Sequence, residues 1–490
     1  MNLKAVFNVV GILLILLAAI LLAPIGVSLY YQHAPLDGYF SEVEAFSLTL
    51  AVALTTGLGL WKLLPSGVET LRDREGFVIV SFSWISISLF GALPYYLSGV
   101  CPVFIDAYFE SMSGFTTTGA TILRNIDPLP RGILFWRNLT QWLGGMGIIM
   151  LSLAVFPALG IGGFHLFKAE VPGGAAVERM QPRLAETAKI LWKVYLTLTC
   201  IEILLLRFGG MNWFDAVCHT FSTVATGGFS PHTASVAAFN SIYIESVIIL
   251  FMLLGGINFA LHYQMIYGDF KRVYQNPELR FYLSLIGLGV AFAAFGLWWA
   301  TPEATFPSAL RRASFQVVSI NTTTGFVTDD YDAWPGFLRL FMLGIMMVGG
   351  CVGSTSGSLK VIRILVIFKV IIRELQKLVR PRGVFHVKVG GKTVKQEHIL
   401  NVIGLTGLYM GVFFVCALLL SLMGLDLTTA VSASTASLFN IGPGLGAVGA
   451  LGNYADLPHL AKAVVIFCMF MGRLEIYGVM MLFLPLTWKK

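Results

Sequence analysis

The 490-residue sequence has few charged residues and little that disulfide or zinc chemistry requires. Charged side chains make up 12% of it, about half of the ~25% typical of soluble domains, whereas 56% of its residues are hydrophobic. This composition excludes a soluble globular enzyme, a disordered protein and a coiled coil. The six cysteines are scattered, with neither a C-x-x-C pair nor a nearby histidine cluster. We therefore predict no disulfide bond and no zinc site, and expect the cysteines to pack among helices.

Motifs for nucleotide chemistry are also missing. No Walker A motif is present, so the sequence offers no visible means of hydrolysing ATP. Residues 444–449 do match G-x-G-x-x-G, but that fingerprint is meaningful only between the strand and the helix of a βαβ unit, so we reject it here. The apolar runs hold no convergent set of His, Cys and carboxylate side chains, which argues against a membrane-embedded enzyme.

The hydrophobic residues form runs long enough to cross a membrane, which takes about 20 apolar residues as a helix. The ten candidate spans are residues 5–30, 41–63, 76–98, 129–157, 188–208, 237–267, 279–300, 334–378, 397–424 and 458–487. The sixth, eighth and tenth are long, so we expect each to be tilted or interrupted. The first is too long for the apolar part of a signal peptide and lacks a convincing cleavage site, so we expect it to be retained.

Four further apolar segments are too short and too broken to cross the membrane: residues 102–122, 212–230, 307–327 and 426–446. They contain the triplets Thr117-Thr118-Gly119, Ala225-Thr226-Gly227, Thr323-Thr324-Gly325 and Asn440-Ile441-Gly442. The glycines that end these triplets are 108, 98 and 117 residues apart, and one or two further glycines follow in the next span each time. This regularity predicts a unit of span, re-entrant segment and span that occurs four times.

We therefore predict an all-α membrane protein with ten transmembrane helices. A two-helix N-terminal extension (1–70) precedes four repeats (71–160, 161–270, 271–380 and 381–490) around a pseudo-fourfold pore. Of the 33 Lys and Arg residues, 24 fall on one side of the alternating spans. The positive-inside rule makes that side cytoplasmic, with both termini inside, and opens the four turns toward the outside.

Irregular backbone at membrane depth survives only where protein buries it or where it lines a watery path. Glycine lets carbonyl oxygens turn inward, and rings of carbonyls can replace the hydration shell of a cation. The C-terminal ends of the short helices before the turns also favour a cation, and no ring of carboxylates occupies the turns. We expect a cation to bind the carbonyls of Thr118, Gly119, Thr226, Gly227, Thr324, Gly325, Ile441 and Gly442.

The whole sequence resembles the membrane subunit of the Trk/Ktr/HKT superfamily of potassium transporters. It is most similar to the bacterial TrkH type. The features that match are the four turns, the two extra N-terminal spans and a Gly/Ser-rich break after the third turn. The resemblance implies that the turn glycines determine selectivity and that glycine at position 119, rather than serine, goes with potassium. The predicted filter residues are then Thr117, Thr118, Gly119, Ala225, Thr226, Gly227, Thr323, Thr324, Gly325, Asn440, Ile441 and Gly442.

The break in the eighth run spans residues 349–358 and holds four glycines, each costing a helix roughly 1 kcal/mol relative to Ala. Such a segment below a filter indicates an intramembrane loop that obstructs the pore, and the resemblance implies that it is the gate; a kink for helix packing is the alternative. Arg473, half-way along the last span, resembles a pore-lining arginine of the family, for which we expect a barrier or latch role. A structural arginine is the other interpretation. The predicted gate residues are Gly349, Gly350, Gly353, Ser354, Thr355, Ser356, Gly357, Ser358 and Arg473.

The remaining ionisable residues give weaker indications of function than the turns and the break. We expect Glu202 to pack inside the bundle, and Asp106 and Asp215 to cap the short helices. We expect three other residues to brace the filter from behind and four to lie at the outer mouth, where they either concentrate cations or are simply solvated. The bracing candidates are Glu110, His219 and Asn321, and those of the outer mouth are His232, Asp329, Asp330 and Asp332.

Two basic stretches, 159–193 and 360–395, account for the net charge of +7. One interpretation is that they form loops that touch anionic lipid. The resemblance implies instead a docking surface for a cytosolic TrkA-type regulatory subunit that binds a nucleotide. Neutralising Lys388, Lys392 and Lys395 would test that docking. The resemblance also implies a homodimer in the inner membrane, and we expect no cofactor in this chain besides K⁺. A proton- or sodium-coupled secondary transporter is the alternative function, although such transporters usually contain inverted repeats.

Overall fold

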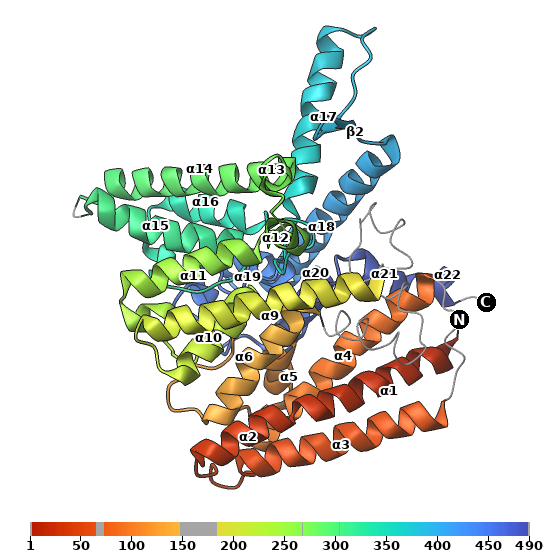
Figure 1. Cartoon of the computed structure of the whole chain (residues 1–490), viewed down its shortest axis with the longest axis vertical. Coiled ribbons are helices and arrows are strands. Elements are labelled where there is room, and N and C mark those ends of the chain that lie inside the picture. Colours follow the sequence, from red (N-terminus) through yellow and green to blue (C-terminus); the bar gives the residue numbers. More distant parts are fainter. Residues whose placement is uncertain (1, 65–72, 148–183, 267, 303, 489–490) are drawn as a thin grey trace.

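The computed structural model describes residues 2–64, 73–147, 184–266, 268–302 and 304–488. Nearly all regular structure in these ranges is helical, as the sequence predicts, and many of the helices run side by side through the body of the molecule (Figure 1). The strands found there are β1 (Lys388–Val389) and β2 (Lys392–Thr393), which form a small antiparallel hairpin. The hairpin turn lies at Gly390 and Gly391, which both have positive φ.

The N-terminal extension consists of α1 (Leu3–Ile20), α2 (Leu22–Tyr31) and α3 (Glu42–Leu63). The first two helices together form one apolar stretch, and α1 packs against α3 and α4. Helix α3 begins at a capping box, in which the Ser41 hydroxyl accepts from the Glu44 N–H and the Glu44 carboxylate accepts from the Ser41 N–H. That box pairs backbone donors that a helix start otherwise leaves without partners.

Four groups of helices follow the extension. The first contains α4 (Asp73–Leu97), α5 (Phe104–Phe115) and α6 (Arg131–Met146), and the second contains α9 (Leu184–Phe208), α10 (Trp213–Val224), α11 (Ile242–Gly255) and α12 (Phe259–Ile266). The third, after the short α13 (Phe270–Tyr274), contains α14 (Pro277–Ala300), α15 (Phe306–Asn321), α16 (Gly336–Met346) and α17 (Val361–Val379). The fourth contains α18 (Gln396–Leu422), α19 (Leu427–Leu438), α20 (His459–Arg473), α21 (Tyr477–Phe483) and α22 (Pro485–Trp488).

Local sequence explains where several of these helices begin. Pro130, Pro335 and Pro458 stand directly before α6, α16 and α20, where the missing N–H of proline leaves no donor unpaired. Asn212 and Asp426 cap the short helices α10 and α19 by accepting from the N–H groups of the third helical residues. Related positions of the groups therefore carry related start signals.

The long candidate spans are interrupted, as expected. In the described part of the chain, five helices are long and apolar enough to cross a membrane, or up to seven when each bent pair is counted as one span. The pair α11 and α12 bends by 104°, and the pair α20 and α21 bends by 118°. Glu475 and Ile476, between α20 and α21, have φ of +53° and +56°, which a continuous helix does not allow. The eighth candidate span is divided between α16 and α17. The last part of the fourth candidate span lies outside the described residues.

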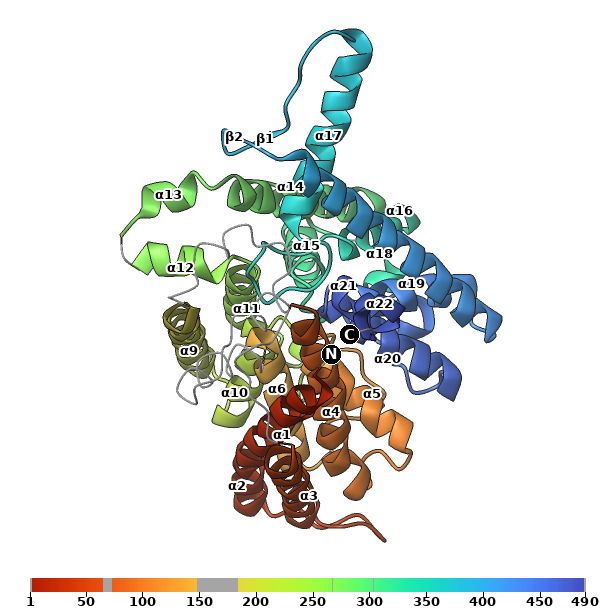
Figure 2. The ribbon, with the colours of Figure 1, turned by 90° about the vertical axis from the view of Figure 1, so that its right-hand side faces the viewer.

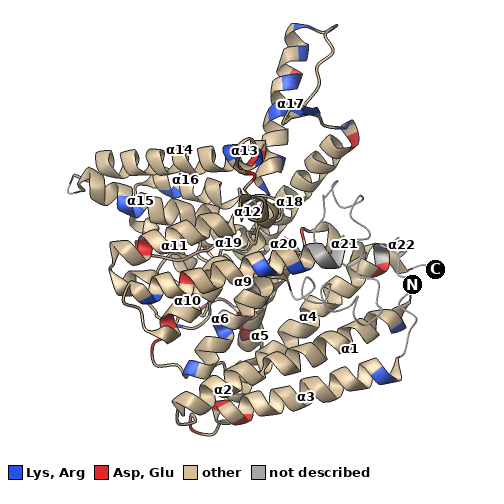
Figure 3. Ribbon diagram, viewed as in Figure 1, with Lys and Arg blue, Asp and Glu red and all other residues tan. Residues whose placement is uncertain are grey.

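Helix α17 projects from the body and carries the β hairpin beside it (Figures 1 and 2). Lys and Arg side chains are frequent along this projection (Figure 3). Its base is held by a small apolar cluster of Val366, Val370, Val387 and Ile399, which joins α17 to the hairpin segment and α18. The start of α1 and the short α22 lie near each other in both ribbon views, at one end of the body.

Candidate functional site

Helices α5, α10, α15 and α19 each end in a turn of the same backbone shape. We call residues 116–119, 225–228, 322–325 and 439–442 the first to fourth glycine turns. In each turn the second residue and the fourth, a glycine, have positive φ, for example +52° and +79° in the first turn. The third residue donates its N–H into the preceding helix at the same place each time, as Thr118 does to the Ser113 carbonyl at 2.9 Å. One local structure therefore occurs four times.

The backbone corrects the alignment of the second turn. There the residues with positive φ are Thr226 and Gly228, whereas Gly227 has none. The equivalent of Gly119 is therefore Gly228, one residue later than the spacing of the sequence motifs suggested. Ala225 corresponds to Thr116, directly after the helix, rather than to Thr117. The sequence alone does not resolve this register because two adjacent glycines both fit the pattern.

The four glycine turns meet in a closed ring. A Cβ built on any of the four glycines would come closer than 3.0 Å to the carbonyl oxygen of the third residue of another turn. The contacts join Gly119 to Gly227, Gly228 to Thr324, Gly325 to Ile441, and Gly442 to Thr118. Each turn thus touches the next in chain order, and the fourth touches the first. Glycine is required at these positions both by its φ and by the approach of a neighbouring backbone.

A cavity of about 390 Å³ lies on one side of the ring. All four ring glycines line it, together with loop residues that follow each of the four turns. Its polar lining includes Arg124, Asp127 and His232. The lining segments lie far apart in the sequence, so only the fold brings them together.

The Gly/Ser-rich segment between α16 and α17 covers the opposite side of the ring. Thr355 donates its hydroxyl to the Val224 carbonyl at 3.0 Å and lies 3.3 Å from the Thr226 hydroxyl. The Gly357 N–H donates to the Thr323 hydroxyl at 2.7 Å. The Ser358 N–H donates to the Phe439 carbonyl at 3.0 Å. The segment therefore contacts the second, third and fourth turns or the helix ends that precede them.

Arg473 completes these contacts at the first turn. Its Nη1 donates to the Thr117 hydroxyl at 3.1 Å and to the Thr355 carbonyl at 2.9 Å, and its Nη2 donates to the carbonyls of Gly144 and Gly145. The guanidinium thus links the ring, the Gly/Ser-rich segment and the end of α6. The nearby Glu475 pairs with Arg363 of α17.

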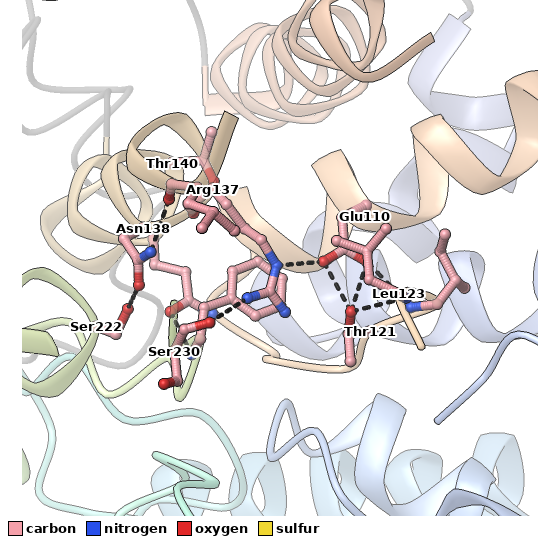
Figure 4. Close-up of polar contacts among 12 residues, drawn as sticks. Glu110, Thr121, Leu123, Arg137, Asn138, Thr140, Ser222 and Ser230 are labelled. Atoms are coloured by element: carbon pink, nitrogen blue, oxygen red, sulfur yellow. Dashed lines mark hydrogen bonds and ion pairs between the residues drawn. The ribbon is translucent and has the colours of Figure 1, made fainter. Parts of the chain in front are cut away.

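Buried polar side chains support the first two turns from behind (Figure 4). Glu110 and Arg137 form an ion pair of 2.5 Å with side chains 0% and 2% exposed. Glu110 also accepts from the Thr121 hydroxyl at 2.9 Å, and Arg137 donates to the Ser230 carbonyl at 2.8 Å. The pair therefore joins the segments that leave the first and second turns. The sequence predicts that Glu110 braces the turns, but it does not single out Arg137.

The other predicted braces lie as follows. His219 is fully buried, and its Nε2 lies 3.0 Å from the Ser230 hydroxyl. Asn321 donates instead to the Val348 carbonyl at 3.0 Å, near the start of the Gly/Ser-rich segment. Glu202 is fully buried, as expected.

The prediction that Asp106 and Asp215 cap the short helices is wrong. Asp106 pairs with Lys462 of α20 at 2.6 Å, and the residue at the helix start is Val103. Asp215 is the third residue of α10, within its first turn, and the cap is Asn212. A carboxylate three residues into a helix is free to bind a cation from another segment, which the sequence does not indicate.

An acidic and histidine cluster lies at the cavity. His232 is 3.0 Å from Asp215 through Nε2 and 3.1 Å from Asp127 through Nδ1. The hydrogen bond with Asp215 raises the pKa of His232 above its usual value, and Asp127 adds to the effect. The pKa of Asp127 is lowered, first by the hydrogen bond from the Thr233 hydroxyl.

The predicted outer carboxylates are mostly engaged within the protein. Asp329 accepts from Arg312 at 2.7 Å, Asp332 accepts from the Gly446 N–H at 2.9 Å, and Asp330 accepts from the Asp332 N–H at 3.0 Å. Residues 444–449 contain a short 3₁₀ helix and no strand, which agrees with the rejection of a nucleotide fingerprint. None of the six cysteines forms a disulfide; five are buried and Cys200 is exposed. Among the described residues, no group of three His, Cys, Asp or Glu side chains is placed to bind a metal.

The basic candidates lie on the projecting part of the molecule. Lys388, Lys392 and Lys395 are exposed in and after the hairpin. The first two belong to β1 and β2, so the hairpin holds them at its surface. Most of the other basic stretch, 159–193, lies outside the described residues.

Several apolar helices, a closed ring of four turns and buried side chains that support it define the class: a multi-pass membrane transport protein. The chain belongs to the TrkH family, whose model, described as a cation transport protein, matches residues 43–489. The Trk system potassium uptake protein TrkH of Salmonella typhimurium is 42% identical and that of Escherichia coli K12 is 41% identical, each over 100% of both chains. A crystal structure of the potassium transporter TrkH from Vibrio parahaemolyticus matches with a TM-score of 0.88 and 39% identity over 100% of both chains.

Proposed function

We propose that this chain takes up potassium through a pore at the centre of the ring of glycine turns. The observation that carries this proposal is the closure of the ring, in which each of the four glycines lies against a carbonyl of the neighbouring turn. The ring adjoins a cavity of about 390 Å³ on one side. The relatives described above are named as potassium uptake proteins, which supports K⁺ as the ion.

Backbone carbonyls of the ring select the ion in this proposal, since oxygen dipoles can replace the water around a cation. With the corrected register, the proposed K⁺ ligands are the carbonyls of Thr118, Gly119, Gly227, Gly228, Thr324, Gly325, Ile441 and Gly442. Two of these oxygens also accept hydrogen bonds from buried side chains, Gly227 from Gln141 at 2.6 Å and Gly442 from Tyr454 at 2.8 Å. Such bonds hold the backbone in place, and a carbonyl oxygen retains a second lone pair.

The Gly/Ser-rich segment 349–358 is the proposed gate. Its hydrogen bonds to three of the turns support a closed arrangement on the face of the ring that lies away from the cavity. Arg473 acts as the latch, because its guanidinium donates both to the first turn and to this segment. A fixed positive charge at that place also opposes the passage of a cation.

The projecting α17 and hairpin are the proposed docking surface for a cytosolic nucleotide-binding regulator of the TrkA type. Their exposed lysines, Lys388, Lys392 and Lys395, support this assignment. The basic residues of this region also support a position at the cytoplasmic side of an inner membrane. We further propose a homodimer in which each chain has its own pore. Nucleotide is expected on the regulator and not on this chain.

Rubidium or potassium flux into proteoliposomes, with sodium as competitor, tests the function. We expect flux that sodium inhibits weakly, and the absence of potassium-selective flux with and without the regulator would overturn the proposal. A coupled transporter would instead show uptake that follows an imposed proton or sodium gradient. Shortening the segment 349–358 separately tests the gate: flux should rise while selectivity persists, and unchanged flux would contradict the role.

A further inference from the structure

The second glycine turn lacks the side chains that support two of the others. In the first turn the hydroxyls of Thr116 and Thr118 lie 2.7 Å apart, and in the third turn those of Thr322 and Thr324 lie 2.8 Å apart. Each pair ties the first residue of its turn to the third. The equivalent residues of the second turn are Ala225 and Gly227, and neither has a hydroxyl.

Gln141 of α6 occupies the place of the missing side chains. Its Nε2 donates to the Gly227 carbonyl at 2.6 Å, and its Oε1 accepts from the Phe229 N–H at 2.9 Å. A Cβ built on Gly227 would come within 2.5 Å of the Gln141 side-chain amide carbon. The glutamine is fully buried, so its amide hydrogen bonds have no competition from bulk water.

The two hydrogen bonds of Gln141 bracket Gly228, the ring glycine. The amide pairs with the carbonyl before Gly228 and with the N–H after it. It therefore fixes the backbone of Gly228 in the same way as a neighbouring β-strand fixes a residue with which it exchanges hydrogen bonds. The fixed carbonyl of Gly227 is also the oxygen that lies against Gly119 of the first turn. Gln141 therefore controls the shape of the second turn and its contact with the first.

We propose that Gln141 is a positioning residue for ion selection, whose side-chain amide replaces the threonine hydroxyls absent from the second glycine turn. The proposal rests on the proposed function of the ring. It also explains why Gly227 is tolerated without a side chain at the third position, where the other turns carry Thr118, Thr324 and Ile441. A larger residue at position 227 and glutamine at position 141 compete for the same space.

The first test replaces the amide. Gln141→Leu removes both hydrogen bonds, and Gln141→Glu keeps the acceptor but loses the donor to the Gly227 carbonyl. Discrimination against sodium is measured by comparing rubidium flux without and with competing sodium. We expect both variants to lose discrimination about tenfold, which is equivalent to about 1.4 kcal/mol. Gln316→Leu is the matched control, because Gln316 is equally buried but donates to the Thr328 hydroxyl instead of a ring carbonyl. It should leave discrimination unchanged.

The second test exploits the competition for space. Gly227→Ala alone should lower discrimination because the new Cβ displaces the Gln141 amide. In a Gln141→Ala background the same substitution meets no obstacle and should cost nothing further. Additive effects of the two substitutions would overturn the proposal, as would normal selectivity in folded Gln141→Leu. If Gln141→Leu fails to fold, this double-mutant comparison decides the question.

The outcomes separate this inference from the function on which it rests. Wild-type protein without potassium-selective flux would remove the proposed function. Selective wild-type protein with unchanged Gln141 variants would remove only the role of Gln141. A purely structural role would lower the thermal stability and the amount of active protein, but it would leave the discrimination of the remaining active protein intact.

Discussion

The two adjacent glycines of the second turn provide a direct test of the ring. Gly228 has a φ of +79°, and a Cβ on it would come closer than 3.0 Å to the Thr324 carbonyl, which is backbone and cannot rotate away. Gly227 has no positive φ, and the three atoms nearest to a Cβ built on it all belong to the Gln141 side chain. Gly228→Ala should therefore damage the ring far more than Gly227→Ala.

The expected size follows from two costs. Alanine in a left-handed conformation costs roughly 1–2 kcal/mol, and an added methyl group in a tightly packed place costs about 1–3 kcal/mol. Their sum of at least about 2 kcal/mol corresponds to a loss of about thirtyfold or more in an equilibrium that depends on the ring geometry. For Gly227→Ala, only the shift of the Gln141 amide applies, so we expect less than about a tenfold loss.

The assay is rubidium uptake by proteoliposomes containing equal amounts of folded protein, with and without sodium. Gly228→Ala should lose most of its selective uptake, and alanine at Gly119, Gly325 or Gly442 should resemble it. Equal effects at positions 227 and 228, or a larger effect at 227, would refute the register and the ring contacts derived from it. Thermal unfolding in detergent identifies variants that fail to fold.

Three further predictions concern groups around the ring. Arg473→Ala should raise flux through the closed protein because the guanidinium no longer joins the first turn to the gate segment; Arg473→Lys should retain part of the barrier, and wild-type flux in the alanine variant would contradict the latch role. Glu110→Gln leaves the Arg137 cation buried without a carboxylate, so unfolding in detergent should show about 3–5 kcal/mol of destabilisation. The control Arg124→Ala removes an exposed ion pair and should change stability by less than about 1 kcal/mol. Equal losses of stability in the two variants would contradict this prediction. The pKa of His232 is raised in the folded protein, so its stabilising contribution is full below the unfolded-state pKa and disappears as the pH rises through the folded-state pKa. His232→Gln should therefore be less stable than the wild type at acidic pH and equal to it at alkaline pH, and a difference that does not vary with pH would count against the ion-pair cluster.

The sequence predicted the helical class and the short segments that end in glycine turns because both depend on local composition. An apolar run determines whether a segment can form a helix in a membrane, and a glycine-bearing turn determines where such a helix can end. Both properties are independent of contacts with other segments of the chain. Glycine density in the segment 349–358 likewise indicated the break between α16 and α17. Among site residues, Gly119 and Gly325 were identified on the same grounds.

The supporting side chains were not predictable in the same way. Arg137 and Gln141 lie on an ordinary-looking amphipathic part of α6, and their partners are 27 and 86 residues away in the sequence. Nothing in the local pattern distinguishes an arginine that faces water from one that enters a buried ion pair. The register of the second turn was missed for a related reason, since Gly227 and Gly228 are equivalent until the backbone assigns a positive φ to one of them.

By itself, the sequence determined the helical membrane-protein class of the chain and which short segments end in turns with glycine. These properties follow from hydrophobicity and backbone freedom, which act within a few residues. Only the tertiary structure decided that the four turns close into one ring, that Gly228 belongs to it, and that Gln141 and Arg473 donate hydrogen bonds to two of its turns. Those features depend on contacts between segments up to 356 residues apart, and such contacts exist only once the whole chain has packed.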